Sequence, residues 1–204
     1  MAQYEFTTLE EVADLCRKHE KTSRISLLRT THGMWVRFNN YEKHPPMVIR
    51  IDGEIASIVF FQITKNRYMN LYEIISLPEY AGKGYGTDLW KSVIKFACEN
   101  QAERLKISCT PESILWHYPH GLIFWGVDKS GSLRSDQQLF PTIEEQVEYR
   151  RRVIEDPQHN LPPVSQVNKF KKEIQEIQFG ENKKIKIQQA IKSIGSAWLA
   201  PYLY

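Results

Sequence analysis

The stretch Tyr72–Ala97, YEIISLPEYAGKGYGTDLWKSVIKFA, constrains the fold more than any other part of the chain. Ile74, Ile75 and Leu77 make the end of its first segment apolar, which is typical of a buried strand. Pro78 ends that strand because proline cannot donate a hydrogen bond to a neighbouring strand. From Thr87 onward the apolar residues recur at helical spacing, on one predicted face made of Leu89, Val93, Ile94, Phe96 and Ala97.

Gly82, Gly84 and Gly86 lie between this strand and this helix, at alternate positions. A glycine-rich turn before a helix exposes backbone N–H groups, and the helix dipole favours negative charge there. The sequence therefore predicts an anion site, such as one for phosphate. It does not fit a P-loop, because no Lys-Ser or Lys-Thr follows the last glycine correctly. It does not fit the dinucleotide fingerprint G-x-G-x-x-G either, because the third glycine is wrongly spaced.

Residues 78–86, PEYAGKGYG, resemble motif A of the GNAT superfamily of acyl-CoA N-acyltransferases. In that family the loop amides and the helix N-terminus bind the pyrophosphate of acetyl-CoA. Ala81 stands where the family usually has Arg or Gln, so one side-chain contact to phosphate is missing. The resemblance implies that acetyl-CoA is the acyl donor. The residues implied to bind it are Ile75, Ser76, Leu77, Ala81, Gly82, Lys83, Gly84, Tyr85, Gly86 and Thr87.

Residues 114–122, ILWHYPHGL, resemble motif B of the same family, in which a tyrosine is often the acid that protonates the CoA thiolate. Aligned on Gly121, that position falls on His117, whereas a gap of one residue places it on Tyr118. Both residues stay candidates for the acid. Glu73 lies on the central strand, near where relatives place a general base. His117 and His120 alone do not predict a metal site, since no third ligand is near in sequence.

The expected order of elements agrees with the GNAT fold of the α/β (α+β) class. That fold has a central mixed, mostly antiparallel sheet of about six to seven strands, splayed at its centre and flanked by helices. A helix is expected from Thr7, where Thr7-Thr8-Leu9-Glu10 matches a capping box. Strands are expected at 34–38, where apolar residues alternate, and at 122–127. Asp52-Gly53 predicts a tight hairpin turn.

The resemblance covers residues 1–140, which we expect to form the acyl-CoA-binding domain. Residues 141–204 are expected to form a Lys-rich helical extension that shapes the acceptor site or a homodimer contact. The tail also leaves nucleic acid open as a partner, because aromatic residues beside lysines can stack on bases. The predicted function is transfer of an acetyl or other acyl group to an amine acceptor. Two alternatives are a nucleic-acid base-modifying enzyme and a non-catalytic protein that binds partners through this fold.

Composition predicts a cytoplasmic protein. It has 204 residues and three cysteines, without metal-like spacing, which is typical of free thiols in a reducing compartment. No apolar run approaches the ~20 residues that a membrane-spanning helix needs, and no signal peptide is evident. A net charge of +3 is too small to indicate nucleic-acid binding by itself.

Overall fold

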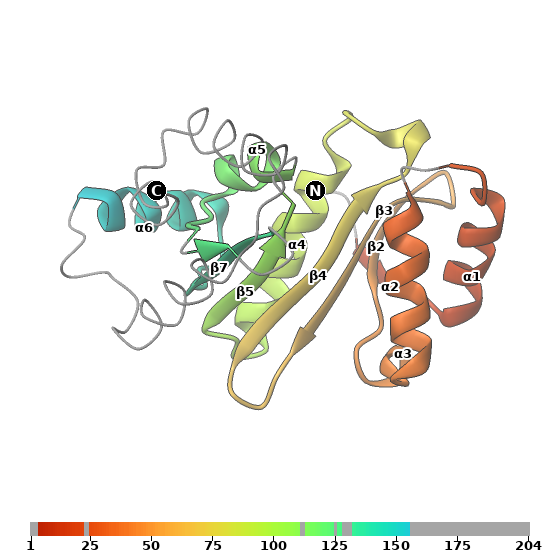
Figure 1. The fold of residues 1–204 in the computed structure, drawn as a ribbon, viewed down its shortest axis with the longest axis horizontal. Coiled ribbons are helices and arrows are strands. Elements are labelled where there is room, and N and C mark those ends of the chain that lie inside the picture. The colour runs from red at the N-terminus through yellow and green to blue at the C-terminus, as the bar shows by residue number, and fades with distance from the viewer. Residues whose placement is uncertain (1–3, 23–24, 111–112, 125, 128–131, 156–204) are drawn as a thin grey trace. The chain divides into compact units, whose positions relative to one another are not determined.

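The structure is a computed structural model that describes residues 4–22, 25–110, 113–124, 126–127 and 132–155. The chain divides into two compact units, with the boundary between Ala102 and Glu103 (Figure 1). They are called unit 1 and unit 2 here. Within the described residues, no helix has both the length and the apolar character needed to cross a membrane.

Unit 1 contains four antiparallel strands that pair in chain order. They are β1 (Tyr4–Phe6), β2 (Met47–Ile51), β3 (Glu54–Ile63) and β4 (Tyr68–Ser76). The helical elements are α1 (Leu9–Lys18), α2 (Ser26–Arg37), α3 (Asn40–Lys43), the short 3₁₀ helix η2 (Pro78–Tyr80) and α4 (Tyr85–Glu99). The helix after the glycine loop is confirmed, and it begins two residues before the predicted start at Thr87.

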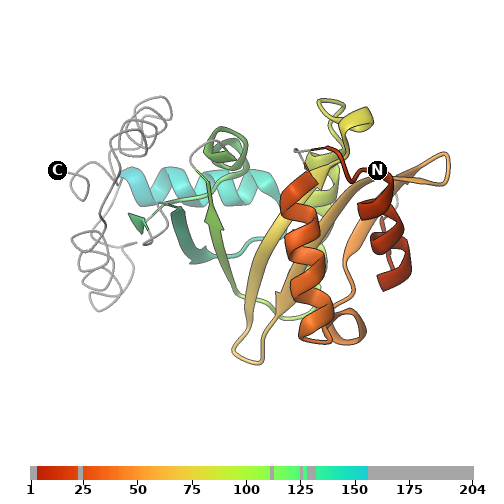
Figure 2. The same cartoon turned by 45° about the vertical axis from the view of Figure 1, so that its right-hand side comes forward.

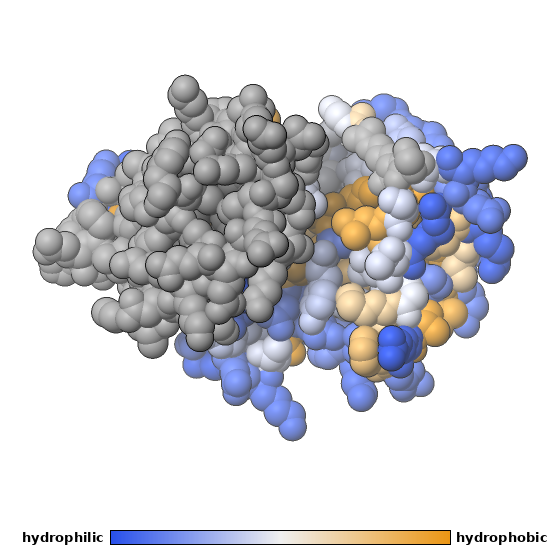
Figure 3. Space-filling model, in the orientation of Figure 1, coloured by the Kyte–Doolittle hydropathy of each residue, from blue (hydrophilic) through white to orange (hydrophobic). Residues whose placement is uncertain are grey.

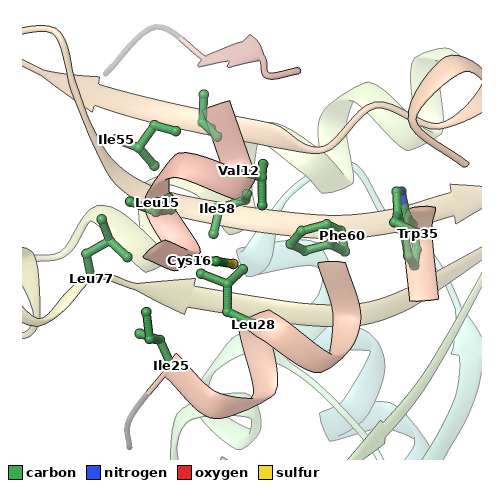
Figure 4. Packing of buried hydrophobic residues seen from close by; sticks show 11 residues of the cluster. Val12, Leu15, Cys16, Ile25, Leu28, Trp35, Ile55, Ile58, Phe60 and Leu77 are labelled. Carbon is green, nitrogen blue, oxygen red and sulfur yellow. The ribbon is translucent and has the colours of Figure 1, made fainter. Parts of the chain in front are cut away.

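Helices cover both faces of these strands (Figures 1 and 2). The neighbouring residues Phe60 and Phe61 of β3 show this alternation, because side chains on a strand point to opposite faces in turn. The ring of Phe60 lies 5.2 Å from Trp35 of α2, whereas the ring of Phe61 lies 5.9 Å from Phe96 of α4. The core between the strands and the first two helices is shown in Figure 4. It consists of Val12, Leu15, Cys16, Ile25, Leu28, Trp35, Val48, Ile55, Ile58, Phe60 and Leu77.

The hairpin turn is confirmed, with Asp52 at φ 51° and Gly53 at φ 83° between β2 and β3. The capping box of α1 is present one residue later than predicted. The Thr8 hydroxyl accepts from the backbone N–H of Glu11, whose carboxylate accepts from the backbone N–H of Thr8. Adjacent threonines followed by adjacent glutamates allow two registers. The observed one also lets the Thr7 hydroxyl donate to Glu11, at 2.6 Å.

The prediction of a strand at 34–38 is wrong, because these residues lie in α2 or directly after it. Alternation over five residues is a weak signal when a longer helical pattern overlaps it. Leu28, Thr31 and Trp35 are the buried residues of α2, and they recur at intervals of three and four. Burial of this stripe against the strands therefore decides the conformation.

Unit 2 contains β5 (Arg104–Cys109), β6 (Gly126–Val127) and β7 (Leu133–Gln138), and β7 pairs antiparallel with both other strands. Its helical elements are α5 (Ile114–His117), the 3₁₀ helix η4 (Tyr118–His120) and α6 (Ile143–Glu155). The strand predicted at 122–127 is wrong for Leu122–Phe124, which is buried but irregular. There the backbone N–H of Ile123 donates to the side chain of Gln137, at 2.6 Å, which replaces a strand partner.

The fold class is confirmed: mostly antiparallel strands are flanked by helices in the expected order. The splay of the sheet would fall between β4 and β5, which belong to different units, and it stays a prediction. The domain boundary at residue 140 also stays a prediction. The predicted helices beyond residue 156 and the Lys-rich tail lie outside the described residues.

Replacing Gly121 with alanine tests the packing of unit 2. Gly121 has φ +84°, and a Cβ there would lie 2.6 Å from the backbone carbon of Gln146 in α6. Strain and overpacking together should lower the free energy of unfolding by about 2–4 kcal/mol. Gly33→Ala is the control, because Gly33 lies inside α2 with nothing within 4 Å of its Cβ position. It should raise stability by about 0.5–1 kcal/mol in chemical denaturation. A Gly121→Ala variant as stable as the parent would contradict this packing.

Candidate functional site

The loop between η2 and α4 takes a conformation that glycine permits. Gly82 has φ +76° and Gly84 has φ +89°, both in the left-handed region. Gly84 is the N-cap of α4, so the chain turns from the loop into the helix at this residue. Nothing lies within 4 Å of the Cβ position at either glycine, so the loop surface is open there. The glycines are thus needed for backbone conformation rather than for lack of space.

This conformation leaves backbone N–H groups available to an anion. Within the described residues, the amides of Gly82, Gly84, Tyr85 and Gly86 have no hydrogen-bond acceptor. The first amide of α4 that bonds back to the loop carbonyl of Gly84 is that of Thr87, at 2.9 Å. The first turn of any helix leaves such N–H groups unpaired, and a ligand anion can satisfy them.

Aromatic side chains and one lysine lie beside the loop. The rings of Tyr80 and Tyr85 lie 6.0 Å apart, and Nζ of Lys83 lies 5.5 Å from the centre of the Tyr80 ring. Ala81 presents only a methyl group, in extended backbone. An anion bound at this loop would therefore meet backbone donors, with Lys83 as the one cation within the loop.

Ile75 and Ser76 form the end of β4, and Leu77 follows directly, before η2 and the loop. Their backbone is tied to β3, where Ile75 pairs with Ile58 and Ser76 with Ser57, while the N–H of Leu77 donates to the carbonyl of Ala56 at 2.9 Å. The hydroxyls of Ser57 and Ser76 lie 2.6 Å apart. This anchoring fixes the direction in which the chain enters the loop.

A β-bulge in β4 sets the orientation of two residues of the candidate site. The pairing of β3 with β4 shifts between Phe60 and Phe61, which leaves Tyr72 as the extra residue beside Glu73. An extra residue interrupts the alternation of side chains. Tyr72 and Glu73 consequently both contact α2. The ring of Tyr72 lies 4.9 Å from Trp35, and Glu73 shares a hydrogen bond with Thr31, one helical turn earlier.

Glu73 is the buried titratable group of this face. Its side chain is 6% exposed, and its Oε2 has no hydrogen-bond partner within the described residues. Burial raises the pKa of the Glu73 carboxyl to about 7, while the hydrogen bond with Thr31 acts in the opposite direction. The nearby thiol of Cys16 also has a raised pKa, chiefly through burial. A carboxyl group that titrates near neutral pH can accept a proton from a substrate.

Tyr72 remains 41% exposed beside this buried carboxyl group. Figure 3 shows apolar surface on unit 1 in the region of α2, where Leu27, Val36 and Phe38 are also exposed. Of the other rings that could line an acceptor site, Trp35 is fully buried, and the ring of Trp116 lies 4.2 Å from that of His120. Trp125 lies outside the described residues.

The second candidate segment, at α5 and η4 in unit 2, contains His117 and Tyr118. His117 is buried, and its Nδ1 has no hydrogen-bond partner among the described residues. Burial, together with a smaller effect of the neighbouring His120, lowers the pKa of His117 to about 3. The imidazole is therefore neutral at pH 7. His120 donates from Nδ1 to the carbonyl oxygen of Trp116, at 2.5 Å. No group of three metal-ligating side chains occurs among the described residues.

The structure thus groups the predicted residues in two places, one in each unit. In unit 1, Glu73 lies on β4 and the loop residues lie between η2 and the start of α4. The two acid candidates lie in unit 2. Sequence reasoning missed Thr31, which hydrogen-bonds Glu73, and the position of the bulge at Tyr72, which turns that residue toward α2. Neither has a local sequence signal, because both depend on how α2 packs against β4.

Comparison with known proteins gives one family and a set of related folds. The profile of the acetyltransferase (GNAT) family matches residues 9–114. No curated protein matches the chain in sequence. Solved structures that are similar at low identity include the following three. The first is a ribosomal-protein-alanine N-acetyltransferase from Brucella melitensis, with TM-score 0.52 and 16% identity over 67% of this chain and 99% of that one.

The second is the PaiA N-acetyltransferase from Thermoplasma acidophilum in complex with coenzyme A, with TM-score 0.53 and 11% identity over 67% of this chain and 98% of that one. The third is a phosphinothricin acetyltransferase from Sinorhizobium meliloti in complex with acetyl-CoA, with TM-score 0.52 and 15% identity over 68% of this chain and 89% of that one. At these identities the likeness shows a shared fold.

Replacing Glu73 with glutamine tests the environment of this carboxyl group. Because its pKa is about 7 in the folded chain and ordinarily 4.5, the unfolded chain loses this proton at lower pH than the folded chain does. The contribution of Glu73 to the free energy of unfolding is therefore complete below pH 4.5. It is lost as the pH rises to about 7, by up to about 1.4 kcal/mol per pH unit. Glu73→Gln should therefore gain stability relative to the parent between these values and keep that gain at pH 8.

The measurement is denaturant unfolding of both chains from pH 4 to pH 8. Glu54→Gln is the control, because Glu54 is exposed and its hydrogen bond with Lys18 lowers the pKa of its carboxyl group. That variant should change stability slightly and in the opposite sense. A difference between Glu73→Gln and the parent that stays constant with pH would contradict the raised pKa.

Proposed function

The chain belongs to the acetyltransferase (GNAT) family, and we propose that it transfers an acetyl group from acetyl-CoA to an amine acceptor. The observation that carries this proposal is the loop at Gly82–Gly86, with left-handed glycines and unpaired amides at the N-terminus of α4. Acetyl-CoA is the acyl donor, since the family uses it and related structures hold coenzyme A or acetyl-CoA.

The loop binds the pyrophosphate of the donor through its backbone. Two or more N–H groups donate to the phosphate oxygens, and the dipole of α4 adds to the attraction. Ala81 contributes no side-chain donor, so Lys83 supplies the positive charge of the loop. Ile75 and Ser76 at the end of β4, with Leu77 directly after them, flank the pantetheine arm. These roles extend the family resemblance to this chain's residues.

Glu73 serves as the general base. An amine must lose a proton before or as it attacks the thioester carbonyl, and a base with a pKa near the working pH is effective. The carboxyl group of Glu73 fits that condition, with its pKa raised to about 7. It is only 6% exposed, so it takes the proton through a water molecule rather than by direct contact.

Tyr118 serves as the acid that protonates the departing CoA thiolate. His117 is the weaker candidate, because burial lowers its pKa to about 3 and leaves a neutral imidazole without a cationic form at pH 7. Tyr118 is only partly buried, at the start of η4. With Tyr118 as the acid, the segment aligns with the tyrosine of the family motif only if a gap of one residue is placed before Gly121.

The acceptor is an amine whose identity the fold does not set. The structural neighbours are named for acceptors as different as a ribosomal-protein alanine and phosphinothricin. Function resides in the site rather than in the fold. A cytoplasmic location is proposed from the cysteine content, which is three residues without metal-like spacing. A nucleic-acid or homodimer contact through the extension stays a prediction, since its basic tail lies outside the described residues.

Valine at Gly84 tests the donor site. Gly84 and Gly53 have nearly equal φ angles, +89° and +83°, and both Cβ positions are open. A β-branched residue costs roughly 1–2 kcal/mol of stability or more at either position. Only Gly84 lies among the loop amides, so Gly84→Val should weaken coenzyme A binding at least about tenfold, which is ~1.4 kcal/mol.

Isothermal titration calorimetry of the two variants and the parent with coenzyme A measures this difference. Gly53→Val, in the hairpin between β2 and β3, should keep the affinity of the parent despite its similar strain. If Gly84→Val binds coenzyme A as tightly as the parent does, the loop is not the donor site.

A further inference from the structure

Helix α6 follows the part of the chain that resembles the acyltransferase domain, yet it packs against the turn that contains Tyr118 (Figure 2). Arg150 of α6 makes two contacts with that one residue. Its guanidinium carbon lies 3.8 Å from the centre of the Tyr118 ring, and its Nη1 donates a hydrogen bond to the Tyr118 carbonyl oxygen. The ring and the backbone of Tyr118 are thus held by the same side chain.

The charge of Arg150 is directed at this tyrosine. Arg151 and Arg152, the next residues of α6, are exposed and pair with Glu148. Within the described residues no carboxylate pairs with Arg150, which is half-buried. Burial lowers the pKa of the Arg150 guanidinium, and Tyr118 acts in the opposite direction. A guanidinium on an aromatic face is attracted to the ring more strongly when it is partly desolvated.

Buried contacts of other α6 residues hold this helix in place, and with it the backbone of Arg150. Gln146 is fully buried: its Nε2 donates to the carbonyl of Gln138 at 2.9 Å, and its Oε1 accepts from the N–H of Phe140 at 3.0 Å. Val153, also fully buried, packs with Ile123. A side chain that must hold another in one geometry is most effective when its own element cannot shift.

We propose that Arg150 is a positioning residue for Tyr118, and this proposal rests on the proposed role of Tyr118 as the acid. In that step the phenol O–H bond breaks, the proton goes to the sulfur of the CoA thiolate, and a free thiol and a phenolate result. The phenolate then regains a proton from solvent. Arg150 holds the ring in one orientation and places a positive charge over the group that becomes negative. Helix α6 would therefore take part in catalysis through Arg150.

The test compares Arg150→Met, Arg150→Lys and the control Arg152→Met in the full chain. Release of thiol from acetyl-CoA is followed with a panel of primary amines and with water alone. Arg150→Met should lower kcat about tenfold and leave KM for acetyl-CoA unchanged, because only the acid step is affected. Arg150→Lys should recover part of kcat, since it keeps the charge and a donor. Arg152→Met should match the parent.

A Tyr118→Phe background separates positioning from general stability. If Arg150 acts through Tyr118, Arg150→Met should add nothing to Tyr118→Phe, as residues of one unit are not additive. Independent, multiplying losses would overturn the proposal, and so would an Arg150→Met variant with the kcat of the parent. A Tyr118→Phe variant of normal kcat would overturn the acid assignment and the positioning role together. A parent that releases no thiol would overturn both, and the proposed enzymatic function as well.

Discussion

Unpaired backbone N–H groups at the start of α4 are the feature on which the rest of the account depends. They are unpaired because the first turn of a helix offers them no acceptor, and the left-handed conformations of Gly82 and Gly84 direct the chain into that helix. The surrounding strands and helix position this loop. Strand β4 delivers the chain to Pro78, its terminal residues are anchored to β3, and the apolar face of α4 packs on the strands. An anion site built from backbone tolerates Ala81, since the donors do not depend on that side chain.

The titratable residues of the two units differ in environment, and those environments separate their roles. In unit 1, burial without a full set of partners raises the pKa of the Glu73 carboxyl to about 7, which suits a base. In unit 2, burial lowers the pKa of His117 to about 3, so that histidine stays neutral and is a poor acid. Tyr118 is next to it and is held by Arg150. Desolvation thus raises the pKa of a carboxyl group and lowers that of an imidazole. It favours Tyr118 over His117 as the candidate acid.

Much of this could be predicted from the sequence, because the informative signals were local. The strand, glycine loop and helix around Pro78–Gly86 carry the family resemblance, and the Asp52-Gly53 turn needs only its own two residues. The predictions were wrong where contacts between residues far apart in the sequence decide the local conformation. Residues 34–38 alternate like a strand, yet packing of Trp35 in the core keeps them helical. Residues 122–124 are apolar, yet the backbone N–H of Ile123 donates to the side-chain oxygen of Gln137 instead of to a neighbouring strand. The bulge at Tyr72 and the Arg150 contact join segments that no short pattern links.

Binding of the acyl donor is the central claim, and a thermal-shift titration of the parent chain tests it most directly. A ligand that binds only the folded state raises the melting temperature by mass action. The account predicts that coenzyme A and acetyl-CoA both raise the melting temperature in a concentration-dependent manner. It also predicts that pantetheine, which has no phosphate, has little effect at the same concentrations, because the loop amides bind phosphate. A melting temperature unchanged by coenzyme A and acetyl-CoA, or raised equally by pantetheine, would contradict the account.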